Sequence, residues 1–199
     1  VEQVTSSNGL HRTYAFRALD PTEKGAVSYF LGMAVCKLFA DKLLSAPWLL
    51  HLDVFRDQLN PALLGGWSRP DLVGQDALGN WHAFETKGRS SVPSSDDKDK
   101  AKAQAQRLVS VDGLACSLQI GSFAYFRQDE LEFYWRDPEP SEPEEAEPIE
   151  INVQDEHWAN YYTLALALAW DLGRESIRAQ AQAIDLRIEV HPKIRDFLL

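Results

Sequence analysis

Three charged residues with the means to do chemistry lie close together in the stretch Ser68–Ser90, SRPDLVGQDALGNWHAFETKGRS. They are Asp71, Glu85 and Lys87. Side chains alternate between the two faces of a β-strand, so Glu85 and Lys87 are expected on one face. Asp71 is expected on a neighbouring strand, opposite or diagonal to Glu85 according to the turn length. A one-residue slip in this register would separate the carboxylates and leave a polar hairpin.

Two carboxylates that converge repel each other unless a cation lies between them. Hard oxygen ligands of this kind suit Mg²⁺ or Mn²⁺, which keep several waters that a substrate can replace. A nearby ammonium can orient a water and stabilise negative charge on a phosphate. The three residue types therefore indicate phosphodiester hydrolysis. The competing interpretation is a solvated hairpin face with a cross-strand salt bridge.

The residues Arg69-Pro70-Asp71 followed by Glu85-Thr86-Lys87 resemble the signature of the PD-(D/E)xK nuclease superfamily. The resemblance implies an α/β protein with a restriction-endonuclease-like αβββαβ core, in which helices flank a mixed sheet. It implies that Asp71 and Glu85 are metal ligands and that the Thr86 carbonyl is a further ligand. It also implies that Lys87 is the catalytic lysine.

The same resemblance implies two residues outside the motif. Members often add a glutamate from the helix before the sheet, and Glu23 fits that place as a metal ligand; an acid there would equally complement the helix dipole. The branch that includes phage exonucleases carries a catalytic glutamine on the helix after the lysine. Gln104 and Gln106 are the candidates, and Gln104 lies closer to the buried stripe of that helix. Leu108 stands where that branch usually has a tyrosine, and an exposed helix position is the alternative for Gln104.

Capping and turn residues predict the elements that must position this site. Asp20-Pro21 predicts the start of a long helix, Pro21–Leu44, which Pro47 follows. The turn QDALGN predicts a hairpin between Arg69–Gly74 and Trp81–Gly88. The other expected elements are a partly helical Trp48–Leu64, a helix from Ser94 that ends before Gly113, strands Ala115–Phe126 and Glu130–Trp135, helices Asp155–Leu172 and Ser176–Ala183, and a strand Asp185–Val190.

The net charge of −10 is largely the property of one segment. Asp137–Glu150 holds seven acidic residues, no basic residue and four prolines, and without it the net charge is −3. Such a composition predicts a linker or surface loop that could mimic nucleic acid or cover the site. The expected organisation is a nuclease-like core (1–136), this linker (137–150) and a C-terminal helical extension (151–199) that packs on the core.

The remaining composition bounds the partners and the compartment. Cys36 and Cys116 lie in apolar surroundings without metal-ligand spacing, which predicts two reduced thiols in a cytoplasmic protein, with a disulfide as the alternative. No apolar run is long enough to span a bilayer, so no membrane partner is expected. A basic cluster near the motif marks where a phosphate backbone would lie. Its members are Arg89, Lys98, Lys100, Lys102 and Arg107.

These observations predict a Mg²⁺- or Mn²⁺-dependent nuclease, a hydrolase acting as an endonuclease or an exonuclease, with DNA as the expected substrate. Paired cuts require two active sites, so a homodimer or a larger assembly is a possible partner state. Two alternatives stay open from the sequence. One is a non-catalytic interaction module that retains the nuclease fold, and the other is the nuclease subunit of a restriction or defence assembly.

Overall fold

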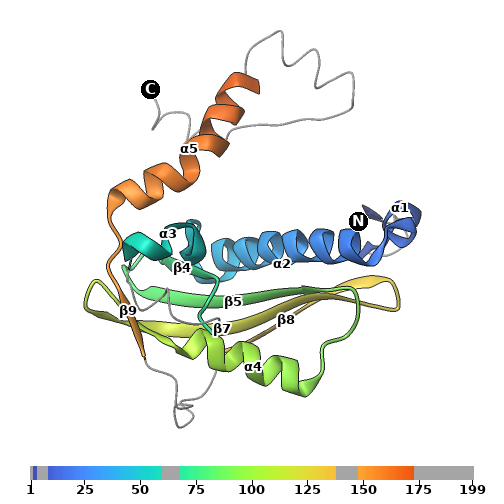
Figure 1. Cartoon of the computed structure of the whole chain (residues 1–199), viewed down its shortest axis with the longest axis horizontal. Helices are drawn as coiled ribbons and strands as arrows, with labels where there is room; N and C mark the ends of the chain where they lie inside the picture. Colours follow the sequence, from blue (N-terminus) through green and yellow to red (C-terminus); the bar gives the residue numbers. More distant parts are fainter. Residues whose placement is uncertain (1, 4–8, 60–67, 138–147, 173–199) are drawn as a thin grey trace. The chain divides into compact units, whose positions relative to one another are not determined.

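The computed structural model describes residues 2–3, 9–59, 68–137 and 148–172 (Figure 1). The chain divides into two compact units, residues 1–153 and 154–199, which are described separately. The second unit contains helix α5 (Asp155–Leu172), whose bounds agree with the prediction. The predicted helix Ser176–Ala183 and strand Asp185–Val190 lie outside the described residues.

The first unit is built on a mixed sheet. Its path runs β1-β2-β8-β7-β5-β4-β3, and β6 pairs with both β7 and β9. Strands β3, β4 and β5 pair antiparallel in succession, β5 pairs parallel with β7, and β7 pairs antiparallel with β8. The strands are β1 (Glu2–Gln3), β2 (Leu10–His11), β3 (Leu49–His51), β4 (Leu72–Gln75), β5 (Trp81–Arg89), β6 (Leu108–Val111), β7 (Leu114–Arg127), β8 (Glu130–Arg136) and β9 (Ile149–Ile151). The protein is therefore a mixed α/β fold, as predicted.

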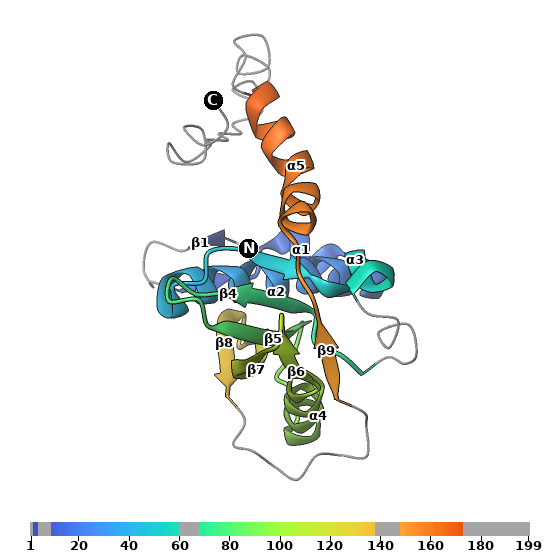
Figure 2. The same cartoon turned by 90° about the vertical axis from the view of Figure 1, so that its left-hand side faces the viewer.

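Helix α2 (Pro21–Leu44) covers one face of the sheet, and its bounds are those predicted (Figures 1 and 2). Asp20 caps its first turn, and the Glu23 side chain completes a capping box with the backbone of Asp20. Ser45 caps the C-terminus of the helix and adopts the left-handed conformation with φ of 56°. Its buried side pairs with strand residues in one core cluster: Met33, Cys36, Phe39, Ala40, Ala46, Leu49, Leu72, Phe84 and Ile120.

Two glycines let α2 approach β5 closely. A Cβ added to Gly88 would overlap the backbone carbonyl of Ser28, and one added to Gly32 would lie 2.7 Å from the backbone nitrogen of Gly88. The Thr86 hydroxyl donates to the Gly32 carbonyl at 3.1 Å and fixes the helix on the strand. Even-numbered residues of β5 from Phe84 onward thus face α2.

The opposite face of the sheet carries helix α4 (Ser95–Gln106) (Figure 1). Ser94 caps this helix, and Asp97 completes a second capping box. Ala101 of α4 packs with Phe123 and Tyr125 of β7. A Cβ added to Gly121, the β7 partner of Glu85, would lie 3.0 Å from the backbone nitrogen of Lys102. Glu85 and its odd-numbered neighbours therefore share the face that α4 partly covers.

The prediction of one helix from Ser94 to just before Gly113 was wrong after Gln106. The helix ends at Gln106, and Leu108–Val111 forms β6, which pairs with β7 and β9. Leu108 and Val111 are fully buried by this pairing. Tertiary pairing of apolar and β-branched residues overrides the helical preference that precedes them.

Other parts of the chain also differ from the predictions. The region from Trp48 begins with strand β3 before helix α3 (Leu52–Leu59), and its predicted end, 60–64, lies outside the described residues. Helix α1 (Tyr14–Ala18) and strands β1 and β2 were not predicted. Ile149 and Glu150 belong to β9, not to a linker, while the acidic residues 138–147 lie outside the described residues.

Both cysteines are free thiols, so the disulfide alternative is wrong. Cys36 is fully buried, and burial raises its pKa to about 12. Cys116 is half-buried, and burial likewise raises its pKa to about 12. Within the described residues, no helix has the length and apolarity needed to cross a membrane.

Candidate active site

The register of the β4–β5 hairpin places Asp71 and Glu85 together. The strands pair Leu72 with Phe84 and Val73 with Ala83. One further step along the same register sets Asp71 directly opposite Glu85. Residues directly opposite in an antiparallel pair project from the same face, so the two carboxylates share a face.

The turn that sets this register is organised by Asp76. Its carboxylate accepts hydrogen bonds from the backbone N–H groups of Leu78 and Asn80, at 2.8 and 2.9 Å, and from the Asn80 amide at 3.0 Å. The bond from the Asn80 side chain is the main cause that lowers the pKa of Asp76 to about 2. Gly79, with φ of 88°, supplies the left-handed step that the turn needs. The turn length is therefore fixed by one ionised side chain.

Asp71 is held from two sides at the point where the β4–β5 ladder ends. Its Oδ2 accepts the backbone N–H of Thr86 at 3.0 Å, and its own carbonyl accepts the N–H of Leu52 at 2.9 Å. The N–H and C=O of one strand residue point to the same side. The Thr86 carbonyl therefore points toward Asp71, beyond Leu72, the last β4 residue in the ladder.

Glu85 is the most unusual residue of this region, because its side chain is 0 % exposed. Neither carboxylate oxygen accepts a hydrogen bond of ordinary geometry from any residue that the structure describes. Burial raises the pKa of Glu85 to about 8; the negative charge of Asp71 adds to this rise and Lys87 opposes it. The hydroxyl of Ser122 on β7 donates to the Glu85 backbone carbonyl at 3.3 Å and holds the residue in place.

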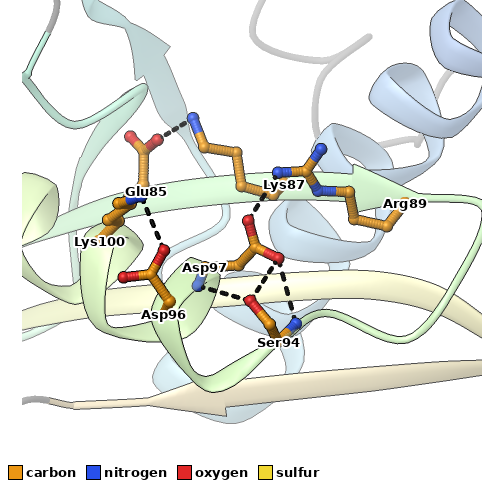
Figure 3. A network of polar contacts seen from close by, with 7 residues as sticks. All are labelled: Glu85, Lys87, Arg89, Ser94, Asp96, Asp97 and Lys100. Carbon is orange, nitrogen blue, oxygen red and sulfur yellow. Dashed lines mark hydrogen bonds and ion pairs between the residues drawn. The ribbon is translucent and has the colours of Figure 1, made fainter.

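Lys87 follows Glu85 on the same face of β5, and its Nζ forms an ion pair with Oε1 of Glu85 (Figure 3). The Lys87 side chain is 35 % exposed, so its ammonium lies between a buried carboxylate and solvent. Burial lowers the pKa of Lys87, but the neighbouring carboxylates of Glu85 and Asp71 outweigh that effect and leave the pKa raised. Asp71, Glu85 and Lys87 are thus in one place.

The structure does not bring Glu23 to this place. Its Oε2 accepts the backbone N–H of Asp20 at 3.0 Å, within the capping box of α2. Glu23 precedes Gly32, the α2 contact of Thr86, by nine residues, which is about 13 Å along a helix. Across the described residues, no group of three or more His, Cys, Asp or Glu side chains is placed to hold a metal ion.

Gln104 lies half-buried on α4, one turn after Ala101. Ala101 packs beside Gly121, which is the β7 partner of Glu85. Gln104 is therefore on the helix that borders the site. Gln106, the other candidate, uses its backbone carbonyl to accept from the Gln119 amide at 3.1 Å.

The basic cluster predicted to meet a phosphate backbone is partly neutralised. Arg89 pairs with Asp97 at 3.2 Å and Lys100 pairs with Asp96 at 2.7 Å, as Figure 3 shows. The ammonium of Lys98 lies 4.2 Å from the ring centroid of Tyr134. The Arg89–Asp97 and Lys100–Asp96 contacts are exposed, so a phosphate could compete for these two cations.

Three supporting residues were missed from the sequence: Asp76, Gly121 and Ser122. A glycine inside an otherwise apolar strand is a signal of close backbone approach, and Gly121 carried that signal. Asp76 stands at the start of a turn that ends in Gly79-Asn80, a position where aspartate commonly bonds the backbone. Nothing in the sequence around Ser122 indicates its bond to Glu85.

The chemistry of the donor set fits a hard divalent cation. Asp71 and Glu85 offer carboxylate oxygens, and the Thr86 carbonyl points toward Asp71. Mg²⁺ is commonly held by one or two carboxylates while it keeps several waters. The oxygens of Glu85 that such an ion would use are Oε2, which accepts no hydrogen bond from a described residue, and Oε1, which Lys87 contacts.

Comparison with known proteins gives no relative for this chain: no family model, no curated protein and no solved structure matches it.

Proposed function

We propose that the chain is a Mg²⁺- or Mn²⁺-dependent nuclease with DNA as its substrate, built on a restriction-endonuclease-like core. The order α2–β3–β4–β5–α4–β7 supports the proposed core, because it runs helix, three antiparallel strands, helix and strand, with α3 and β6 added. The parallel pairing of β5 with β7 across α4 also fits it.

One observation carries the proposal: Glu85 is fully buried beside Asp71, with Lys87 in contact with its Oε1 and no hydrogen bond from a described residue to its Oε2. A buried polar atom without a partner costs about 1–3 kcal/mol, and more when it is charged. Lys87 offsets part of this cost, and a bound divalent ion would offset more of it. A structural salt bridge alone would be expected to satisfy the carboxylate more completely.

Each residue of the site would have a separate role in hydrolysis. A divalent cation bound here would supply Lewis-acid chemistry toward a water and a scissile phosphate. Asp71 and Glu85 would hold it, with the Thr86 carbonyl as a further oxygen ligand. Lys87 would orient the attacking water and stabilise negative charge that grows on the phosphate.

The test is cleavage of plasmid and linear DNA in Mg²⁺ or Mn²⁺ by wild type and by Asp71→Asn, Glu85→Gln and Lys87→Met. Each variant keeps the shape of its side chain, and each is expected to reduce cleavage by at least about 100-fold, as loss of a catalytic group does. Asp96→Asn is the matched control, because Asp96 is an exposed carboxylate paired with Lys100 and lies outside the site. Equal cleavage by all five proteins would contradict the proposal.

A second candidate is an interaction module that keeps the fold without catalysis. It is favoured by the small number of metal ligands that the described residues offer. They offer two carboxylates, and one of these already contacts Lys87. DNA binding by wild type with no cleavage in either metal, and with no change in Glu85→Gln, would support this module over the nuclease.

A further inference from the structure

Lys87 contacts the very carboxylate that the proposed function assigns to the metal. Its Nζ pairs with Oε1 of Glu85, and no other cation of the described residues pairs with that carboxylate. The ammonium therefore provides the positive charge that stabilises the ionised form of a fully buried glutamate in the metal-free protein.

A metal ion and the Lys87 ammonium would compete for this oxygen. Two cations at one carboxylate oxygen repel each other strongly in a site that is shielded from water. Glu85 cannot move toward solvent to bind both cations, because its side chain is 0 % exposed and Ser122 donates a hydrogen bond to its backbone carbonyl. Asp71 is likewise pinned by Thr86 and Leu52.

Lys87 is the mobile member of the group. Its side chain is 35 % exposed and carries a flexible four-carbon stem, so its ammonium can leave toward solvent without disturbing the sheet. On the solvent side it would lie along β5 near Arg89, on the face shown in Figure 3.

We propose that the Lys87 ammonium occupies the cation site in the metal-free protein, where it pairs with Glu85. Metal binding then displaces this ammonium toward solvent. This inference rests on the proposed metal site and adds an order of binding at that site. The ammonium becomes available to a substrate phosphate only after the metal has bound, so metal binding precedes productive substrate binding.

The test measures how fast each lysine reacts with an amine-acylating ester, by peptide mass spectrometry of the full chain with EDTA or with Mg²⁺. Displacement predicts that acylation of Lys87 rises about tenfold on addition of Mg²⁺, the factor that corresponds to loss of 1.4 kcal/mol of ion-pair protection. Lys98 and Lys100 are internal controls, since their partners are Tyr134 and Asp96, and their rates should not change.

Asp71→Asn supplies the matched variant. Its amide oxygen can still accept the Thr86 N–H, so the fold is kept while a metal ligand is lost. The Mg²⁺-dependent rise at Lys87 should vanish in this variant and persist in Asp96→Asn.

Calorimetric titration of the same samples distinguishes failure of the displacement from failure of the proposed metal site. If Mg²⁺ binds and the reactivity of Lys87 stays the same or falls, the displacement is wrong and the metal site stands. If Mg²⁺ does not bind to wild type, both the displacement and the proposed metal-dependent function are wrong.

Discussion

At the scale of single residues, the protonation of Glu85 determines the charge of the site. A buried carboxylate beside a second carboxylate favours its protonated form, and the pKa of about 8 expresses this. Lys87 acts in the opposite direction, and a metal ion at the proposed site would do the same. The free energy of unfolding is therefore linked to the charge on one side chain, and metal binding at the proposed site would be linked to it as well.

This linkage predicts how the metal-free protein responds to pH. The pKa of Glu85 is raised from 4.5 to about 8 on folding, so the folded state holds the proton more tightly between these values. The free energy of unfolding should therefore fall as the pH rises from about 5 to about 8, by an amount on the order of a few kcal/mol. Urea denaturation in EDTA across this range measures it.

Glu85→Gln is the control, because the variant lacks the ionisable group and should show a flatter dependence. The lowered pKa of Asp76, about 2, acts below this window and should not contribute. The same pH slope in wild type and Glu85→Gln would contradict the assignment to Glu85.

At the scale of elements, Glu23 belongs to the start of α2 and not to the site. Glu23→Ala removes one half of the capping box and should lower the free energy of unfolding by roughly 0.3–1 kcal/mol. Metal affinity and DNA cleavage should equal those of wild type at a temperature where both proteins are folded. A loss of Mg²⁺ affinity in this variant, measured by calorimetry, would restore Glu23 as a ligand.

Two glycines should respond oppositely to replacement by alanine, because Gly88 lies against the backbone of α2 and Gly25 lies in open space. Gly88→Ala adds a methyl group against the backbone of Ser28 and should destabilise the fold by about 1–3 kcal/mol. Gly25→Ala, in open space on α2, should stabilise it by about 0.5–1 kcal/mol, because alanine favours a helix over glycine. Urea denaturation of both variants checks this, and similar effects of the two would contradict the helix–strand packing.

The elements show what sequence patterns can predict. Asp20-Pro21 and the capping box determine where α2 begins, and these are local signals. Strand β6 was missed because no breaker separates Gln106 from Leu108, and its pairing partners lie elsewhere in the chain. Three-residue strands such as β3 and β9 carry too few residues for alternation to be recognised.

The site was predictable only where it depends on local sequence patterns. Alternation along one strand is local, so Glu85 and Lys87 could be assigned to one face. The position of Asp71 depends on the turn, whose length follows from three hydrogen bonds to Asp76. The burial of Glu85 depends on α4 and β7 and has no local signal. Its consequence, a carboxylate without ordinary hydrogen bonds, became visible only in the assembled sheet.

At the scale of the whole molecule, the net charge of −10 opposes the approach of DNA. Five glutamates lie between 138 and 147: Glu139, Glu142, Glu144, Glu145 and Glu147. Replacing them with glutamine halves the net negative charge and should tighten DNA binding at low salt, with a smaller effect at high salt. Fluorescence anisotropy with a labelled duplex measures both conditions, and unchanged affinity would remove any role of this charge in substrate binding.

The central claim is that Asp71 and Glu85 form a divalent metal site, and calorimetric titration of the full chain with Mg²⁺ tests it most directly. From the proposed site we expect one binding event in wild type and in Asp96→Asn, and none in Glu85→Gln. Absence of binding in wild type at millimolar metal, or equal binding in Glu85→Gln, would contradict the claim.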